Sequence, residues 1–305
     1  TQMLKIERTN NNIAIGGYAG AALSGALKSI AIGHDALRYE NAAEGNLALG
    51  YQALKSCNHD DAEYNIAIGF EAMEECTAPG LDNIAIGQHA LVHASLTGAR
   101  NIAIGKNVMA ANTGSNSVAV GAYALETQTS GTGNVGIGFK ALQVATSSNN
   151  TALGYLAGYK LEEGSANIAI GTNALYTEIE GGQNTAVGTN ALSNQNAGGS
   201  DSTLANTYNT GVGASAGLYL STGTHNTFIG GQAGLGITGT PLAGNGNTAI
   251  GAQSGLELEG VAHSNTFVGQ NAGNTTEAGV ENTCIGCNAK TYDATSTNQI
   301  VIGNN

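Results

Sequence analysis

The chain has 305 residues, of which 46 are glycine, 4 are cysteine and none is tryptophan, and its formal net charge is -12. Acidic residues outnumber basic ones by 22 to 10 without any Lys/Arg cluster, which makes phosphate backbones and anionic membrane surfaces unsuitable partners. No apolar run reaches the roughly 18 to 20 residues of a membrane span, and the first residues lack a signal-peptide core. We therefore predict neither nucleic-acid binding nor membrane insertion.

Residues 1–11 are predicted to be an N-terminal lead-in, and residues 12–305 a single continuous repeat domain. From residue 12 onward a five-residue phrase of the type NIAIG returns 17 times, always closed by glycine. The closing residues are Gly16, Gly33, Gly50, Gly69, Gly87, Gly105, Gly121, Gly138, Gly154, Gly171, Gly188, Gly213, Gly230, Gly251, Gly269, Gly286 and Gly303. The commonest interval is 17 residues, and two intervals are much longer, with 25 residues after Gly188 and 21 after Gly230.

The residue types within the phrase follow a fixed pattern. Position one is Asn in 14 of the 17 units, position three is almost always small, and position four is always Ile, Val or Leu. Units near 17 residues are too short for the two helices of a helical solenoid, whereas the β-branched residues suit strands. The pattern predicts an all-β fold, a parallel β-solenoid of about 17 short coils of 17 to 18 residues.

Each coil is expected to contain a strand over the phrase, a turn at the glycine, a second short strand around the following Ala-Leu, and a loop back. The glycine would turn a corner with φ > 0 or lie close to the next coil. The asparagines would stack coil upon coil, each amide bonding to the next or to the turn backbone. The ladder formed in this way is represented by Asn65, Ile68, Gly69, Asn101, Ile104, Gly105, Asn167, Ile170 and Gly171.

The two faces of the phrase strand are both nearly uncharged. Because side chains alternate, positions two and four point one way, and we expect them, as with Ile68, to fill the coil interior. Positions one, three and five would form the opposite face, on which a small residue such as Ala67 permits close approach. A strand with neither face suited to water must be covered on both, so we infer a homo-oligomer of rods packed lengthwise about a common axis.

Position two changes along the chain. It is Ile, Leu or Val through Val135 and mostly Thr from Thr151 onward. The fourth residue after the glycine changes similarly, from Leu or Met to frequent Gly. The two halves are therefore expected to differ in cross-section.

Several motifs have explanations other than chemistry, so we predict no catalytic residue, no cofactor and no metal site. Gly131, Gly133 and Gly136 form GxGxxG, but a dinucleotide site also needs a helix, and none is readable there. The CxxC of Cys284 and Cys287 has no second ligand pair for zinc. The acidic stretch 57–63 matches no calcium-binding spacing, and no Ser-His-Asp arrangement or carboxylate pair is evident.

Two further cysteines occupy equivalent places in neighbouring coils. Cys57 and Cys76 each lie seven residues after a phrase glycine, so they should sit one above the other, about 4.8 Å apart. That separation is within the Cα range of a disulfide, although a flat ladder gives poor bridge geometry. A disulfide and a pair of stacked free thiols both remain open.

The longest connectors are the best candidates for recognition, because a rigid scaffold positions its loops. They cover residues 193–208 and 235–246. Their Gly, Ser, Thr and Asn content suits sugar hydroxyls, and plain solvated linkage explains it equally well. The candidate receptor-binding residues are Asn194, Asn196, Ser200, Asp201, Thr203, Thr238, Thr240 and Asn245.

The repeat resembles that of a known family. NTAIGAQSG (247–255), NTAVGTNAL (184–192) and NLALGYQAL (46–54) resemble repeats of bacteriophage tail fibres. They also resemble the head repeats of trimeric autotransporter adhesins, to which SNSVAVG (115–121) is most similar. The resemblance implies a left-handed, trimeric β-solenoid that stands off a surface and touches a host. The closing STNQIVIGNN resembles the last coil before the cleaved C-terminal chaperone domain of such fibres.

The expected function is a structural and host-recognition fibre, a homotrimer without enzymatic activity. Its expected partners are further copies of itself and a host surface glycan or protein receptor. Its expected location is a virion tail fibre or an extracellular cell surface. Three alternatives stay open: a bacterial trimeric surface adhesin, an ice-binding β-solenoid that uses the Thr column, and a polysaccharide-degrading β-helix.

Overall fold

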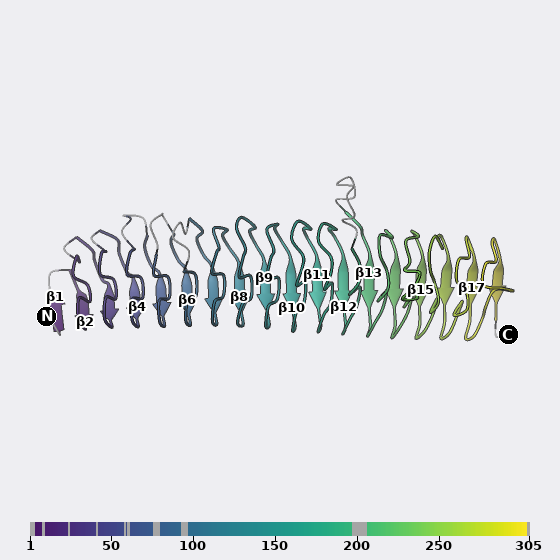
Figure 1. Cartoon of the computed structure of the whole chain (residues 1–305), viewed down its shortest axis with the longest axis horizontal. Helices are drawn as coiled ribbons and strands as arrows, with labels where there is room; N and C mark the ends of the chain where they lie inside the picture. The colour runs from purple at the N-terminus through teal and green to yellow at the C-terminus, as the bar shows by residue number, and fades with distance from the viewer. Residues whose placement is uncertain are drawn as a thin grey trace. The chain divides into compact units, whose positions relative to one another are not determined.

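A computed structural model describes residues 4–7, 10–23, 25–40, 42–57, 59, 62–75, 80–92, 97–196 and 206–303 (Figure 1). The chain divides into two compact units, residues 1–149 and 150–305. This division coincides with the change of position two from Ile or Val to Thr. No helix is present within the described ranges, and every element is a short β-strand.

The first unit is a parallel ladder whose first phrase strand is covered by an antiparallel one. Its strands are β1 (Leu4–Glu7), β2 (Asn12–Ile15), β3 (Ile30–Ile32), β4 (Leu47–Leu49), β5 (Ile66–Ile68), β6 (Ile84–Ile86), β7 (Ile102–Ile104), β8 (Val118–Val120) and β9 (Val135–Ile137). β1 pairs antiparallel with β2, which leaves that edge of β2 unavailable to another strand. From β2 to β9 each strand pairs in parallel with the next.

The second unit is also a parallel ladder. Its strands are β10 (Thr151–Leu153), β11 (Ile168–Ile170), β12 (Thr185–Val187), β13 (Thr210–Val212), β14 (Thr227–Ile229), β15 (Thr248–Ile250), β16 (Thr266–Val268), β17 (Thr283–Ile285) and β18 (Ile300–Ile302). Each pairs in parallel with the next. In both units the register never slips, so each phrase position lies opposite the same position in the next coil, as Ala67 lies opposite Ala85.

These ladders confirm the predicted all-β parallel β-solenoid, with one strand for each of the 17 phrases. The second short strand expected around Ala-Leu was wrong. The residues there form turns because alternate residues lie in the left-handed region, as with Asp35 (φ 58°) and Leu37 (φ 47°). Their backbone still bonds coil to coil, since the Leu37 N–H donates to the Ala53 carbonyl at 3.1 Å. A single domain over residues 12–305 stays a prediction.

The glycine that closes each phrase is required by two constraints at once. Gly69 has φ 139°, a region that L side chains rarely adopt. A Cβ on Gly69 would also lie 2.6 Å from the carbonyl oxygen of Gly87 in the next coil. The coils therefore touch backbone to backbone at this corner, which leaves no room for any side chain.

The structure reverses the predicted faces of the phrase strand. Asn65 and Ala67 are fully buried inside the coil, whereas Ile66 and Ile68 are half-buried and point outward. The expectation that Ile68 fills the interior, with Ala67 on the outer face, was therefore wrong. The physical reason is the width of the coil, whose interior is filled by Ala67 together with the buried Ala72 and Met73. Large residues at both inward positions would overfill it.

Buried asparagines bind each coil to the next, as predicted. The Asn65 Oδ1 accepts the backbone N–H of Asn83 at 3.0 Å, and its Nδ2 donates to the Gly80 carbonyl at 2.8 Å. The same pair of bonds recurs at Asn101, which bonds Ser117 and Gly114. Each side chain thus fixes both the next strand and the loop that leads to it.

Two coils carry Ser in place of this Asn, and each of them also buries a long polar side chain near the loop. Ser117 Oγ still accepts the Asn134 N–H at 3.2 Å but is too short to reach the loop carbonyl. The buried Gln128 donates to the Gly131 carbonyl instead. In the coil of Ser29, the buried Glu40 serves the loop by accepting the N–H of Ala43 at 2.8 Å.

The core uses two interchangeable packing solutions. In most coils the residue four after the glycine is Leu or Met, and its side chain fills the interior. Its backbone has a positive φ, as at Leu37. In other coils Gly takes that place, and a large side chain fills the space from elsewhere. A Cβ on Gly255 would lie 2.9 Å from Leu258, and one on Gly273 would lie 2.5 Å from Phe267. The change from Leu to Gly along the chain is therefore a change of packing within a constant coil.

We predict that Gly69→Ala destabilises the first unit by about 3 kcal/mol or more, because it adds backbone strain and a clash with the next coil. The matched control is Gly231→Ala, since a Cβ there meets nothing within 4 Å. Thermal unfolding followed by circular dichroism gives the comparison. Equal midpoints for the two variants would contradict the close approach at Gly69.

We predict a ranked effect at Asn65. Asn65→Ala leaves two buried backbone groups without partners and should cost about 2 to 5 kcal/mol. Asn65→Ser should cost less, because Ser29 and Ser117 show that a hydroxyl retains the bond to the next strand. Amide hydrogen exchange at Asn83 reports that bond directly. Protection at Asn83 that is lost equally in both variants would refute the ranking.

Candidate functional site

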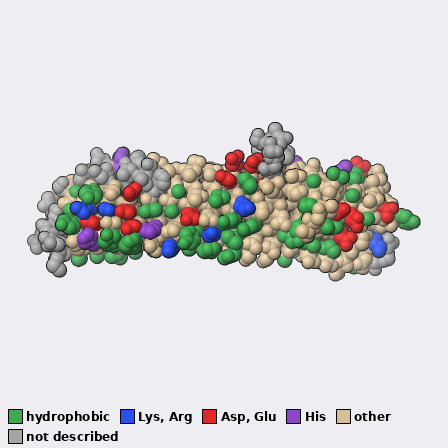
Figure 2. Space-filling model, viewed as in Figure 1, with side chains coloured by type: hydrophobic (Ala, Val, Ile, Leu, Met, Phe, Trp, Pro, Cys, Tyr) green, Lys and Arg blue, Asp and Glu red, His purple; other side chains and the backbone are tan. Residues whose placement is uncertain are grey.

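The outward face of the first unit is an almost uncharged apolar surface. It is formed by positions two and four of the phrase and by the residue directly after the glycine, for example Ile66, Ile68 and Phe70. In the coils of β2 to β9 these three columns contain one Lys, Lys106, and no carboxylate. In Figure 2 hydrophobic side chains gather along the lower border of this unit, with a few basic side chains among them and the acidic side chains above. A contiguous exposed apolar surface of this kind marks an interaction site.

The corresponding face of the second unit carries hydroxyls. Thr185, Thr210, Thr227, Thr248, Thr266 and Thr283 are directly paired in one column. They lie beside a column of Val and Ile, and each is half-buried. Their hydroxyls make no hydrogen bond to another residue that the structure describes. This column therefore presents hydroxyls outward at the regular spacing of the ladder.

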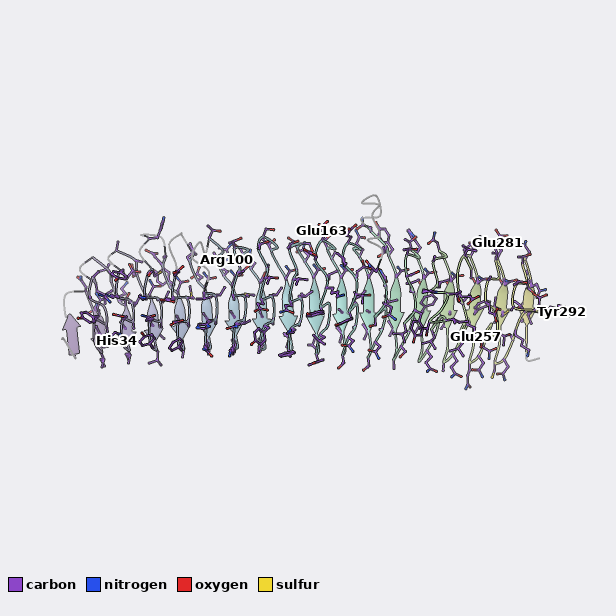
Figure 3. The ribbon with its side chains drawn as sticks, in the orientation of Figure 1. His34, Arg100, Glu163, Glu257, Glu281 and Tyr292 are labelled. Carbon is purple, nitrogen blue, oxygen red and sulfur yellow. The ribbon has the colours of Figure 1, made fainter. Side chains whose placement is uncertain are left out.

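A stack of exposed aromatic rings borders the apolar face of the first unit. The ring centroids of His34 and Tyr51 are 5.7 Å apart, and those of Tyr51 and Phe70 are 5.1 Å apart, with nearly parallel planes. Tyr18 and His89 extend the stack at its two ends. Figure 3 shows His34 at the end of its coil, beyond the strand. Because the rings cover one another's faces, their edges are what the surface presents.

Ion pairs lie beside these rings, some within the coil of Asp35 and one between the coils of Lys55 and Glu74. Asp35 binds Arg38 at 3.0 Å and His34 at 3.1 Å, and Arg38 lies over the Tyr18 ring at 4.7 Å. Glu74 accepts a hydrogen bond from Lys55 at 2.9 Å, and this bond is the main reason that the pKa of Lys55 is raised. These charges satisfy one another, so they add coil-to-coil contacts without leaving a strongly charged patch.

The candidate receptor-binding residues fall into three groups. Ser200, Asp201 and Thr203 lie outside the described residues. Asn194 is exposed and Asn196 half-buried at the start of the first connector. Thr238 and Thr240 are exposed in the second connector, where Ile237 and Thr240 form an isolated antiparallel bridge and Thr240 donates to Glu259. Asn245 is exposed at the end of that connector.

A hollow lies beside Asn245 in the second unit. It is lined by Ala243, Gly244 and Asn245 from the loop before β15, and by Val261, His263 and Ser264 from the loop before β16. Its volume is about 350 Å³. The sequence predicted Asn245 as a candidate because it lies in a long connector. It did not predict His263 and Ser264, because the connector that contains them, in the next coil, is short. Only the stacking of the two coils brings them together.

The cysteines do not form a chelating pair in the part of the chain that is described. Cys284 is fully buried at position three of its phrase, whereas Cys287 is exposed after the glycine, so the two face opposite sides of the corner. Burial raises the pKa of the Cys284 thiol. No group of three or more His, Cys, Asp or Glu that could hold a metal occurs among the described residues. Cys57 is buried, and its predicted neighbour Cys76 lies outside the described residues, so the disulfide stays a prediction.

The GxGxxG glycines serve the coil. Gly136 lies in β9, and a Cβ there would be 3.3 Å from Leu125 of the neighbouring coil. Gly131 lies in the preceding loop, where a Cβ would meet the Ser147 carbonyl. Close packing between coils therefore accounts for these two glycines.

Compared with known proteins, the chain matches no family model and no curated protein. The resemblance to tail fibres and adhesin heads thus depends on the repeat residues themselves. Within the described ranges, no helix is long and apolar enough to cross a lipid bilayer.

Proposed function

We propose that the chain is a subunit of a homotrimeric structural and host-recognition fibre, such as a bacteriophage tail fibre, exposed on a virion or a cell surface. The observation that carries this proposal is the almost uncharged apolar face that eight successive coils of the first unit turn outward. A second copy of the chain is its natural cover, because the copy presents the same face with the same repeat spacing. The left-handed coil and the threefold assembly follow the resemblance to phage fibres and adhesin heads.

The corrected orientation of the phrase changes which residues would meet between copies. The interface would contain Ile66 and Ile68 with their equivalents, while Asn65 and Ala67 stay inside each coil. An interface made of Ile, Val and Leu resembles a domain core cut in half, which is typical of obligate oligomers. The described parts of the variable connectors lie outside these columns, where they would remain available to a receptor. A bacterial trimeric surface adhesin would share this assembly and stays the nearest alternative.

Two carboxylates of the second unit are widely separated. In Figure 3, Glu257 and Glu281 lie at opposite ends of their coils. A polysaccharide-cleaving site needs a pair of carboxyl groups roughly 5 to 10 Å apart across a groove. The polysaccharide-degrading alternative therefore gains no support from these two residues.

We predict that Ile104→Asp prevents assembly of the trimer, because each copy would bury an unpaired carboxylate at a cost of several kcal/mol. The matched control is Val261→Asp, which places the same charge on a side chain that is 69% exposed and lies outside the face. Sedimentation should give about three chain masses for the wild type and the control, and one for Ile104→Asp. A wild-type monomer, or a trimer that survives Ile104→Asp, would contradict the proposed assembly.

Ice binding is a second candidate function, favoured by the six outward Thr hydroxyls of the second unit that lack partners among the described residues. The fibre proposal predicts no thermal hysteresis, because neighbouring copies would cover this column. The freezing and melting points of a solution of the wild-type protein supply the measurement. A gap between them that disappears in Thr227→Tyr would favour ice binding and argue against the fibre.

A further inference from the structure

We propose that the hollow beside Asn245 binds a neutral saccharide. This inference deepens the proposed function, and rests on it in so far as a host-recognition fibre needs a receptor contact. The hollow itself is formed within one chain, by two adjacent coils of the second unit. Its existence therefore does not depend on assembly.

The hollow lies beside a gap in a column of exposed side chains. In the second unit the residue before each phrase is exposed, and these residues form a column that includes His225, Gly246, Ser264 and Glu281. At Gly246 the column is interrupted, and a Cβ there would meet nothing within 4 Å. In Figure 3, Glu281 marks the end of the coil at which this column lies. The gap is flanked above and below by side chains of the neighbouring coils.

The walls of the hollow are held by backbone hydrogen bonds between coils. The Ser264 N–H donates to the Asn245 carbonyl at 3.0 Å, and the Gly246 N–H donates to the Thr224 carbonyl at 3.0 Å. Asn245 Oδ1 accepts the Thr224 N–H at 2.7 Å, which fixes the orientation of its amide. The Nδ2 of Asn245 makes no hydrogen bond within the described ranges. A rigid donor is thus available at the edge of the hollow.

The lining combines one apolar wall with neutral polar groups. Val261 and Ala243 supply the apolar part of the lining. Val261 is 69% exposed, so its side chain is accessible to a ligand. Asn245, His263 and Ser264 supply an amide, an imidazole and a hydroxyl. A pyranose ring has the matching pattern, with a C–H face and a rim of hydroxyls. A volume of about 350 Å³ suits a ligand at the small end of the usual range for pockets.

The charges around the hollow disfavour anionic and cationic ligands. Residues 150–305 contain ten acidic residues and two basic ones, Lys160 and Lys290, and neither lysine lines the hollow. Phosphates and acidic sugars would therefore find no Lys or Arg in the lining and a negative surrounding. A cation would find no carboxylate among the lining residues. A neutral, hydroxyl-rich ligand is the class that fits both the polarity and the charge.

Saturation-transfer NMR on the full chain tests the proposal with methyl glucoside, methyl galactoside, methyl mannoside and N-acetylglucosamine, and with glucose 6-phosphate as the anionic comparison. At least one neutral sugar should receive saturation and the phosphate none. Ala243→Trp fills the hollow and should weaken binding at least tenfold, and His263→Ala should weaken it several-fold. The matched control is Glu163→Trp. Glu163 is exposed and lies four residues before the phrase of its coil, as Ala243 does in its own coil, but it does not line the hollow, so binding should be unchanged.

Saturation of none of the neutral sugars, or a signal that persists in Ala243→Trp, would overturn the proposal. Equal binding of glucose 6-phosphate would overturn the neutral class. Circular dichroism of each variant shows that the coils remain folded. A trimer that binds no sugar refutes this inference alone, whereas a monomer that binds sugar refutes the proposed assembly alone.

Discussion

The fold depends on a polar group that every coil must bury. A phrase asparagine such as Asn65 lies inside the coil because its amide has two fixed partners there, the strand of the next coil and the loop before it. An unpaired backbone group in that position would cost free energy comparable to a lost hydrogen bond. Once Asn65 points inward, alternation along the strand sends Ala67 inward and Ile66 and Ile68 outward. The polar residue thus decides the direction of the apolar ones.

This inversion gives the surface its character. A short coil cannot bury two branched residues beside Asn and Ala, so it exposes them in columns that run coil after coil. The aromatic rings after the glycine continue the same surface in the first unit, and the Thr column replaces part of it in the second. The interior of the coil is therefore narrow, and the residue types that differ most between the two units lie on the outside. Binding of another copy or of a receptor would involve these outward residues.

The repeat predicted the fold well because its signals were local and repeated. The period, the glycine and the asparagine each determined a feature that the structure confirms, including the stacked amides at Asn65 and Asn83. The direction of Ile68 was missed because hydrophobicity was weighed above the hydrogen bonds that Asn65 needed. The second strand was wrongly predicted because nothing in a residue such as Leu37 signals that its φ is positive. The partners of Asn245 in the hollow were missed because contacts between coils depend on stacking that the period gives only approximately.

The constant register has a consequence for how such a chain can change. Successive strands pair in the same register throughout each unit, so the backbone of a coil offers the same donors and acceptors to the coil before it and to the coil after it. Inserting or removing a whole coil between two coils of the same side-chain packing would change the number of coils and leave the remaining backbone contacts the same. Length is then a quantity that can vary in whole steps, separately from the identity of whatever is recognised.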